Sequence, residues 1–306
     1  METIPHRQHQ RPDTALYEPF CRVTLRLIHI AHDLPHLGPA CSELRDKFGA
    51  LALVPTMGAL HSGHEALVRA AAMSGAGVIV SIFVNLMQFG PNDDLARYPQ
   101  DEAGDLAKLE DWGCHAVWLP DVAASIRLGN RPLSSWAGRR KTGRQRAPRV
   151  FSWGSYSLRE ALRPGAAGYC VFRPKDWQQL QVVQRMVADP LLPLKVVGMP
   201  TVREPDGFAL SSRNRFLEPD RRASAPRLFA ILQSVALVLA GGCSVADLLA
   251  VAMPDLTADG FAVDYLALVE GASLGQLQTV QPGARLIAAA RLGSVLLLDN
   301  VAVTPS

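Results

Sequence analysis

Residues 51–64 read Leu-Ala-Leu-Val-Pro-Thr-Met-Gly-Ala-Leu-His-Ser-Gly-His, and the fold class can be predicted outward from this segment. Its apolar first part has the length and composition of a buried strand, and a helical pattern follows over 65–74. The alternation continues with strand-like segments at 78–84 and 116–119 and a helical segment at 101–112. Strands and helices that alternate in this way predict a parallel sheet with helices on its faces.

The regular alternation of predicted strands and helices ends in the last third of the sequence. A helix is predicted at 178–187 and a strand at 194–197, and from residue 220 a helical run through 239 precedes short strands. These strands are predicted near 263–268, 285–290 and 294–298. We therefore predict an α/β fold, in which a Rossmann-like parallel-sheet nucleotide-binding domain at 23–201 follows a polar tail at 1–22 and precedes a smaller C-terminal α+β domain at 202–306.

Composition excludes several classes of protein. The 306 residues are 48% apolar and 19% charged, which excludes a disordered chain, a collagen and a small disulfide scaffold. The five cysteines are scattered without a Cys-x-x-Cys spacing, so we expect neither a zinc site nor a disulfide framework, and a reducing cytoplasm fits best. We also expect no signal peptide and no membrane span, because the first twenty residues lack an apolar run.

Charge is unevenly distributed along the chain. The net charge is +3, yet residues 130–163 contain nine basic residues and one acidic residue, so that segment carries +8 and the rest carries −5. A basic segment of this kind is one that could bind nucleic acid. A non-catalytic nucleic-acid-binding protein is therefore one interpretation of the sequence, although we expect no nucleic-acid partner.

The histidine pair at the end of the 51–64 segment points to chemistry on phosphate. His61 and His64 are three residues apart at a helix start, so their rings lie on one face. The unpaired N–H groups and the dipole of a helix N-terminus favour an anion there, and imidazoles beside them can stabilise a leaving pyrophosphate. Gly58 and Gly63 would let the backbone approach the ligand closely.

Other polar residues are expected to face the same cleft, because ligands of open parallel sheets bind beyond the carboxyl ends of the strands. Asn85 and Gln88 follow the 78–84 strand and could hydrogen-bond a small hydroxy acid. Lys175 and Arg213 could neutralise phosphate oxygens in a transition state, with neighbouring serine hydroxyls as further donors.

Taken together, these motifs resemble the pantothenate synthetase (pantoate:β-alanine ligase) family of the nucleotidyltransferase superfamily, whose signature is His-x-Gly-His. The segments that carry the resemblance are 54–64, 81–91, 98–99, 175–180, 185–189, 200–217 and 297–301. The resemblance implies a two-step reaction: ATP and pantoate give pantoyl adenylate and pyrophosphate, and β-alanine then attacks the adenylate to give pantothenate and AMP. It also implies Mg²⁺ with the ATP, a homodimer, and a C-terminal domain that closes as a lid.

The resemblance implies roles for individual residues. His61 and His64 match the pair that stabilises the pentacoordinate phosphate, and Lys175 and Arg213 join them as catalytic residues. Pantoate is expected at Met57, Gln88 and Gln179, and ATP at Met57, Gly58, His64, Lys175, Asp176, Ser211, Ser212 and Arg213. The ligands of the metal cannot be assigned from the motifs. Leu86, Ser62 and Gln100 are mild departures from the family pattern, which we expect to tune rather than abolish activity.

One block, at about 136–174, departs strongly from the family pattern. The family has Glu-Gly, then Arg-Pro-Gly-His-Phe-x-Gly-Val-Ala-Thr-Val-Val, then Pro-Asp-x-Ala-x-Phe-Gly before Lys-Asp, and this chain has none of these. Read one nucleotide later, the codons of 147–161 permit Arg-Pro-Gly-Tyr-Phe-Arg-Gly-Val-Ala-Thr-Val-Cys-Ala-Lys-Leu. The same offset permits Leu-Glu-Gly at 142–144 and Arg-Pro-Asp-Ile-Ala-Tyr-Phe-Gly-Gln at 166–174. We infer a compensated pair of frameshifts.

This block leaves alternatives open. A central strand would have to be rebuilt from residues 168–172, with Arg173 and Pro174 in place of small, flexible residues, and misfolding or a disordered basic loop is the expected consequence. The chain is then either an active ligase or a frameshift-damaged, inactive copy of one. Another nucleotidyltransferase with the His-x-Gly-His signature is a further alternative, against which the Gln-Phe-Gly-Pro and Gln-Gln motifs argue.

Overall fold

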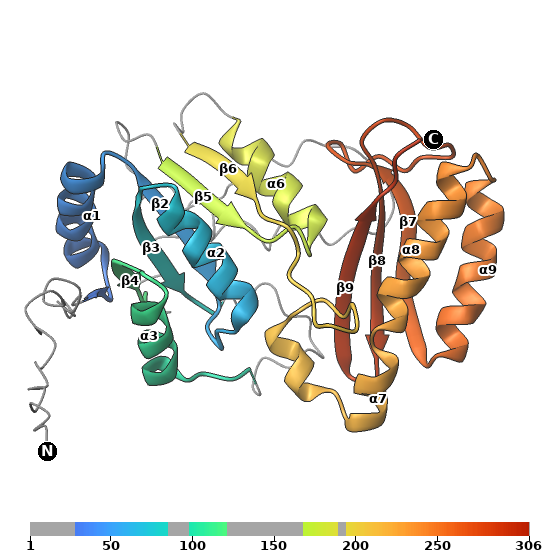
Figure 1. Ribbon diagram of the computed structural model, residues 1–306, viewed down its shortest axis with the longest axis horizontal. Coiled ribbons are helices and arrows are strands. Elements are labelled where there is room, and N and C mark those ends of the chain that lie inside the picture. Colours follow the sequence, from blue (N-terminus) through green and yellow to red (C-terminus); the bar gives the residue numbers. More distant parts are fainter. Residues whose placement is uncertain (1–27, 85–97, 121–167, 189–193, 306) are drawn as a thin grey trace, which may run out of the picture.

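The structure of the chain is a computed structural model, and it describes residues 28–84, 98–120, 168–188 and 194–305. Two sheets organise the described residues: one parallel and one antiparallel, lying at opposite ends of the molecule (Figure 1). The predicted α/β fold is confirmed. The 1–22 tail, Gln88 and most of the anomalous block lie outside the described residues, so the structure leaves those predictions as they stand.

The first sheet has six parallel strands in the order β1-β4-β3-β2-β5-β6. The chain builds outward from β2 in both directions, so the order reverses between β2 and β5, and an open sheet of this kind binds ligands at such a switch point. The elements of this half are β1 (His29–Ala31), α1 (Leu34–Phe48), β2 (Leu51–Thr56), α2 (Ser62–Met73), β3 (Gly77–Ile82), α3 (Glu102–Asp111), β4 (Ala116–Trp118), β5 (Gly168–Phe172), α6 (Trp177–Val187) and β6 (Leu194–Gly198).

Helices cover both faces of this sheet. The core on one face joins α1 and α6 to the strands, and the core on the other face joins α2 and α3 to them. Because β2 and β3 are buried on both faces, they read as nearly continuous apolar runs instead of alternating ones. For this reason residues 51–64 could be predicted from the sequence as a central strand followed by a helix.

The second sheet is antiparallel, in the order β7-β8-β9. Its core lies between the strands and α8 and α9, which cover the face turned away from the first sheet (Figure 1). The elements of this half are η5 (Ser212–Phe216), α7 (Pro219–Ser224), α8 (Arg227–Ala240), α9 (Val245–Ala258), β7 (Phe261–Glu270), β8 (Ala284–Leu292) and β9 (Val295–Ala302).

One helical stretch in the described residues, Pro219–Ala240, is long and apolar enough to cross a membrane by length and composition. The chain divides there into α7 and α8 at Ala225 and Pro226, and α8 buries a row of residues in the second core. Leu228, Leu232 and Leu239 belong to that row. The apolarity of this stretch is accounted for by packing against the β-sheet.

Residues 168–172 form a strand, which corrects the expectation of local misfolding there. β5 pairs in parallel with β2 on one side and with β6 on the other, and Cys170 at its centre is fully buried. The apolar run Gly-Tyr-Cys-Val-Phe suits a central position because both faces of the strand are covered. The end of β5 therefore lies beside the end of β2, at the switch point of the sheet.

Candidate functional site

The site begins with the tight loop that leaves β2. The Gly58 N–H donates to Thr56 Oγ1 (3.3 Å), and the Thr56 hydroxyl donates to the Ser81 carbonyl (2.9 Å). Gly58 has φ +82°, and a side chain there would come within 3.1 Å of Ile82 and 3.2 Å of Asp105. Glycine is required at this turn because the left-handed backbone and the close approach both exclude a Cβ. Met57, half-buried, lies in the same loop.

Asp105 on α3 fixes the rest of the loop. Its carboxylate is almost fully buried, with 2% of the side chain exposed, and Oδ1 accepts the Leu60 N–H at 2.8 Å. Lys108, one turn further on, donates to the Leu60 carbonyl (3.1 Å) and lies 3.5 Å from the same carboxylate oxygen. Both backbone groups of Leu60 are thus held from α3, immediately before the first histidine.

His61 and His64 form a reciprocal cap at the start of α2. The Gly63 N–H donates to His61 Nδ1 (3.1 Å), and the His61 N–H donates to His64 Nδ1 (3.3 Å). An unprotonated Nδ1 places the proton of a neutral imidazole on Nε2. Both rings therefore present an Nε2–H group away from the helix, with ring centroids 4.2 Å apart, as the spacing of the pair predicts.

The surroundings keep both imidazoles uncharged. Burial, and after it the positive charges of Arg173 and Lys175, lower the pKa of His61 to about 3. The pKa of His64, which is 4% exposed, is also lowered, first by burial and then by Arg173. Neutral rings that carry Nε2–H groups act as hydrogen-bond donors to an anion throughout the neutral pH range.

Arg173 follows β5 and reaches the two histidines. Its Nη2 lies 2.8 Å from His64 Nε2, and its Nη1 lies 3.3 Å from His61 Nε2. Burial lowers the pKa of this guanidinium to about 10, which leaves it charged at neutral pH. The bulky cation expected to disturb the anomalous block thus lies directly at the predicted site.

Lys175 comes two residues later, and backbone carbonyls hold its amine. Nζ donates to the carbonyls of Ala209 (3.2 Å) and Leu210 (3.4 Å). Burial lowers the pKa of Lys175 to about 7; Asp299 opposes this shift, and Arg173 and Arg213 add to it. The predicted Lys175 and the two histidines are therefore brought to one end of the sheet.

Asp176 and Gln179 begin α6. The Gln179 N–H donates to Asp176 Oδ1 (2.9 Å), so the carboxylate caps the helix, and burial raises the pKa of Asp176. Trp177 donates its indole N–H to the Gly271 carbonyl at 2.7 Å, and Arg285 stacks on its ring with the guanidinium carbon 3.7 Å from the centroid. The start of α6 is thus joined to the antiparallel sheet.

The serine and arginine motif predicted to bind nucleotide lies in and before η5. Ser211 caps this short helix by accepting the Arg213 N–H at 3.4 Å. Ser212 is buried, and its hydroxyl donates to the Ala59 carbonyl (3.2 Å) in the loop before the histidines. Burial raises the pKa of Tyr98, which hydrogen-bonds to Ser212. The structure therefore brings the loop after β2 and the motif at 211–213 together.

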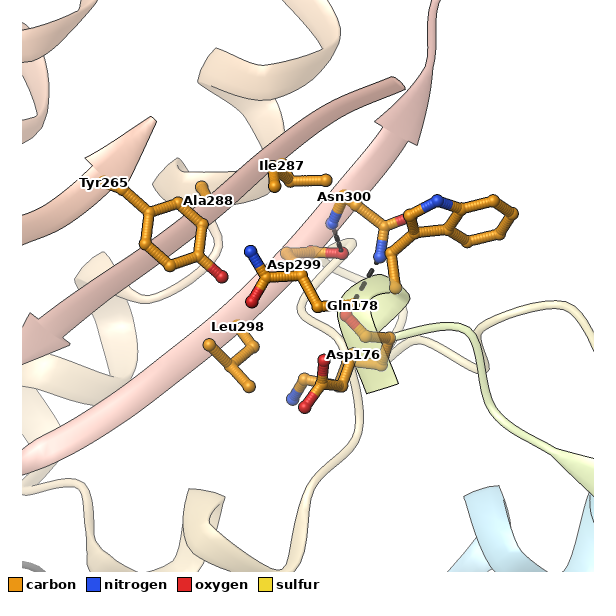
Figure 2. Close-up of a pocket in the computed structure, with 10 residues that line it drawn as sticks. Asp176, Gln178, Tyr265, Ile287, Ala288, Leu298, Asp299 and Asn300 are labelled. Carbon is orange, nitrogen blue, oxygen red and sulfur yellow. Dashed lines mark hydrogen bonds between the residues drawn. The ribbon is translucent and has the colours of Figure 1, made fainter. Parts of the chain in front are cut away.

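A small hollow lies between the start of α6 and the antiparallel sheet (Figure 2). Figure 2 shows the Tyr265 hydroxyl and the Gln178 amide directed toward one another there, with Leu298 and Asp176 below them in this view. The residues that line it are Lys175, Asp176, Trp177, Gln178, Tyr265, Ile287, Ala288, Leu298, Asp299 and Asn300. The prediction from sequence missed the members from β7, β8 and β9.

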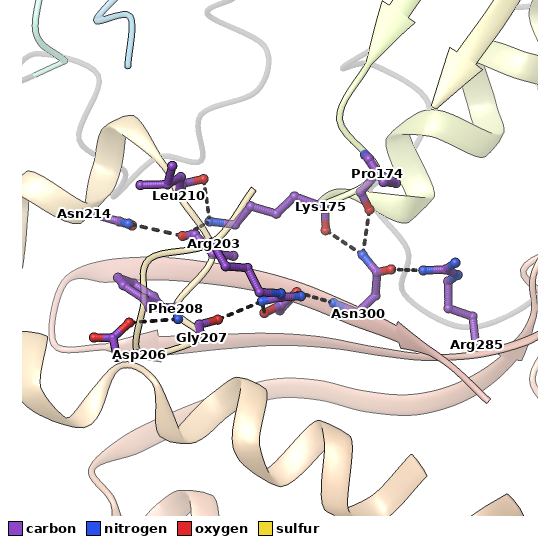
Figure 3. Close-up of polar contacts among 12 residues, drawn as sticks. Pro174, Lys175, Arg203, Asp206, Gly207, Phe208, Leu210, Asn214, Arg285 and Asn300 are labelled. Carbon is purple, nitrogen blue, oxygen red and sulfur yellow. Dashed lines mark hydrogen bonds and ion pairs between the residues drawn. The ribbon is translucent and has the colours of Figure 1, made fainter. Parts of the chain in front are cut away.

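Asn300 connects the two halves beside this hollow, and an ion pair of Arg203 lies next to it within the C-terminal half (Figure 3). The Asn300 side-chain amide donates to the carbonyls of Pro174 (2.6 Å) and Lys175 (2.9 Å), while Arg285 donates to its oxygen. Arg203 forms a two-pronged ion pair with Asp299, at 2.6 and 2.9 Å. Two adjacent polar side chains in a strand whose other residues are all apolar are the signal that could have found Asp299 and Asn300.

The described residues contain no group of three or more His, Cys, Asp and Glu side chains that could hold a metal ion. Mg²⁺ commonly binds through substrate phosphates and water with few protein ligands. The cationic site at the ends of β2 and β5 fits a metal that arrives with a phosphate chain, and it does not fit a protein-built metal centre.

Comparison with known proteins gives one consistent result. The family model described as "Pantoate-beta-alanine ligase" matches residues 29–302. Among curated proteins, the pantothenate synthetase of Granulibacter bethesdensis is 46% identical over 288 residues, covering 90% of this chain and 96% of the relative. That of Acidiphilium cryptum is 45% identical over 284 residues, covering 90% and 100%.

Solved structures agree. The crystal structure of a pantothenate synthetase from Thermus thermophilus superposes with a TM-score of 0.76 at 36% identity, covering 91% of this chain and all of that one. The pantoate-beta-alanine ligase of Francisella tularensis, described as complexed with beta-gamma ATP and beta-alanine, gives a TM-score of 0.68 at 25% identity, covering 90% and 97%. On the family match and these identities, this chain belongs to the pantoate-beta-alanine ligase family.

Proposed function

We propose that this chain catalyses the ATP-dependent condensation of pantoate with β-alanine. The observation that carries the proposal is the convergence of two histidine Nε2–H groups with Arg173 and Lys175 at the ends of β2 and β5. These donors and charges lie at the switch point of the sheet, where such folds bind nucleotides. The family to which the chain belongs supplies the identity of the substrates.

The reaction needs no protein nucleophile. In the first step a pantoate carboxylate oxygen attacks the α-phosphorus of ATP, the bond to the β-phosphate oxygen breaks, and pyrophosphate leaves with the electron pair. In the second step the amine of β-alanine attacks the carbonyl carbon of pantoyl adenylate, AMP leaves, and the amine loses a proton. The protein aligns the reactants and neutralises charge at phosphorus.

The proposed catalytic groups are the two histidines with Lys175 and Arg213. His61 and His64 donate Nε2–H groups to the phosphate oxygens, on which negative charge builds up in the transition state. Lys175, whose pKa of about 7 leaves much of it charged at neutral pH, adds a cation beside them. The proposed ATP contacts are Met57, Gly58, His64, Lys175, Asp176, Ser211, Ser212 and Arg213, and the proposed pantoate contacts are Met57, Gln88 and Gln179.

Several wider features belong to the same proposal. Mg²⁺ accompanies ATP and neutralises part of the charge on its phosphates when it is bound. The division of the chain near residue 201 makes 202–306 a lid that closes over ATP, and the contacts of Ser212 and Asn300 across the two halves support this arrangement. We further propose that the chain is cytoplasmic, which its scattered cysteines support, and that it forms a homodimer, which rests on the resemblance to the family alone.

Pantoate-dependent release of pyrophosphate tests the activity. We expect the purified chain to release pyrophosphate and AMP from ATP in equal amounts when both pantoate and β-alanine are present. Exchange of labelled pyrophosphate into ATP should require pantoate but not β-alanine, because the adenylate forms in the first step. His61→Asn should lose activity, whereas His36→Asn, which replaces an exposed histidine of α1, should keep it.

Other outcomes separate the alternatives. Pyrophosphate release that ignores pantoate but follows another acceptor would identify a different nucleotidyltransferase, which the 46% identity to a pantothenate synthetase does not favour. A folded chain without any exchange activity would identify an inactive copy. Retention on DNA or RNA that falls with added salt would instead favour a nucleic-acid-binding protein.

The frameshift hypothesis is tested at the level of the gene. Sequencing codons 130–180 should show bases that permit the family motifs one nucleotide later, at 142–144, 147–161 and 166–174. Codons that do not permit those residues would eliminate the hypothesis. If the bases do permit them, a chain expressed in the restored frame provides the comparison for every activity measurement on the chain as written.

A further inference from the structure

Arg173 lies where three hydrogen-bond donors face one another. The Nδ1 atoms of His61 and His64 accept backbone N–H groups at the start of α2, so both Nε2 atoms carry the proton. The guanidinium of Arg173 can only donate. Its contacts of 2.8 Å with His64 Nε2 and 3.3 Å with His61 Nε2 therefore compete with the backbone N–H groups at the Nδ1 atoms, because a neutral imidazole accepts at only one nitrogen. The two rings offer two acceptors to four donors, so the group holds more donors than the protein can satisfy.

The charge of Arg173 is also unbalanced. Among the ion pairs of the described residues, none joins Arg173 to a carboxylate, and its one carbonyl contact, from Nη1 to Leu210, is long at 3.5 Å. Lys175 adds a second cation to the same group. A partly buried cation among neutral donors is costly unless an anion accompanies it.

Space for this arrangement comes from Gly63. A Cβ at this position would lie 2.9 Å from Arg173 Nη1 and 2.8 Å from His61 Cε1. Gly63 occupies the first turn of α2, where the helix dipole favours negative charge. The missing side chain thus lets the guanidinium and both rings meet at the positive end of the helix.

The distances suit one shared oxygen atom. Hydrogen bonds between nitrogen donors and a charged oxygen are about 2.7–2.9 Å long. An oxygen at that distance from both Arg173 Nη2 and His64 Nε2, which are 2.8 Å apart, completes a nearly equilateral triangle. His61 Nε2–H and Arg173 Nη1–H remain for a second oxygen of the same group.

We propose that Arg173 is a catalytic residue of this chain, which binds the diphosphate of ATP, later released as pyrophosphate, together with His61 and His64. The proposal rests on the proposed function, since it names a further ligand for the substrate of that site. The acceptor oxygens of the diphosphate satisfy all three donors and balance the charge of the guanidinium. Arg173 therefore holds the leaving group while the α-phosphorus is attacked.

Binding of inorganic pyrophosphate, measured by titration calorimetry, tests this role without turnover. Arg173→Met keeps the length of the side chain and removes its charge and donors, and we expect it to raise the Kd for pyrophosphate and for ATP about tenfold or more. Arg173→Lys keeps the charge but loses the paired donors, so its Kd for pyrophosphate should lie between those of the unsubstituted chain and Arg173→Met. Arg69→Met is the matched control, because Arg69 lies on the same helix as His64, is exposed, and pairs with Glu65.

The calorimetric result decides whether Arg173 binds the diphosphate. An unchanged Kd in Arg173→Met overturns the proposal, and a lower Kd identifies Arg173 as a group that blocks the site. Failure of the unsubstituted chain to bind pyrophosphate also overturns it. Pantoate-dependent AMP formation, measured on the same samples, shows separately whether the ligase function holds, because that activity can persist when Arg173 plays no part.

A second measurement tests the proposal if Arg173→Met does not fold. In the unsubstituted chain, ¹⁵N NMR of the histidine rings should show protonated Nε2 and unprotonated Nδ1 for both His61 and His64. Added pyrophosphate should shift the Nε2–H signals, and in Arg173→Lys the same shifts should require more pyrophosphate. Equal titration curves for the two chains would contradict the proposal.

Discussion

At the scale of single residues, the sequence identified the histidine pair but not the state in which the fold holds it. The motif and the helix start predicted that the two rings share a face, since that follows from spacing alone. The neutral state of the rings depends on burial and on Arg173, a residue 109 positions away from His64. Such an environment is set by tertiary packing and cannot be obtained from local sequence.

The neutral state of His61 gives a prediction about stability and pH. In the unfolded chain His61 takes up a proton near pH 6.5, but in the folded chain it does so only near pH 3. Between these values the unfolded state binds more protons, so stability falls as the pH drops below 6.5. We expect His61→Asn, which keeps an N-cap acceptor, to lose about 2 kcal/mol less unfolding free energy than the unsubstituted chain between pH 7 and pH 5.

Urea unfolding at the two pH values measures this difference. His36→Asn is the control, because it removes an exposed histidine of α1, which is not part of the loop between β2 and α2. An equal loss of stability in all three chains would show that His61 is protonated in the folded state well above pH 3.

Lys175 gives a prediction about activity and pH. Its pKa of about 7 in the free protein means that it loses its charge as the pH rises through neutrality. A charged amine is needed to attract phosphate, so kcat/KM for ATP should decline above about pH 7. In Lys175→Arg, whose side chain stays protonated, that decline should be absent even if the rate is lower. Superimposable pH profiles of kcat/KM for the two chains would argue against a titrating Lys175 in the site.

At the scale of elements, buried strands could be predicted from the sequence, whereas helices that contain proline or glycine could not. The segments around β2, α2, β3 and β4 were predicted within a few residues, because a strand covered on both faces gives a continuous apolar run. The sequence prediction missed α1, which contains Gly38 and Pro39, and α9, which contains Pro254. Proline and glycine usually end a helix, but packing against the sheets keeps both of these continuous.

Asp105 shows how one element positions another. Its carboxylate on α3 accepts the Leu60 N–H in a buried setting, which holds the loop that leads into His61. We expect Asp105→Ala to cost about 1–3 kcal/mol of unfolding free energy, because that N–H loses its partner. Activity should fall further than stability predicts, since His61 is no longer held in place. Asp105→Asn, which retains one acceptor oxygen, should recover part of both losses.

Urea unfolding and the steady-state rate together measure this prediction. Glu110→Ala is the matched control, because it removes an exposed carboxylate from the same helix. If Asp105→Ala and Glu110→Ala have equal rates, the loop is held in place without Asp105.

At the scale of the whole molecule, the two sheets could be predicted from the sequence, but the side-chain contacts that join them, here called the joint, could not. The end of the regular alternation after residue 201 indicated a second unit, because strand and helix patterns are local. The joint depends on Asn300, which donates to Pro174 and Lys175 across 126 and 125 positions of sequence. No local pattern encodes which amide meets which carbonyl, so this part of the site emerged only from the fold.

The contact between the antiparallel sheet and the turn that carries Lys175 can be tested at Asn300. Asn300→Asp preserves the size of the side chain and the oxygen that Arg285 contacts, but it replaces the amide donor that holds Pro174 and Lys175 with an acceptor. Two carbonyls then face a carboxylate, so we expect the turn that carries Lys175 to shift and KM for ATP to rise at least several-fold. Stability should fall by about 1–3 kcal/mol. Gln278→Glu makes the same chemical change at an exposed position and should change neither quantity. Equal values of KM and of unfolding free energy in the two variants would mean that the antiparallel sheet does not position Lys175.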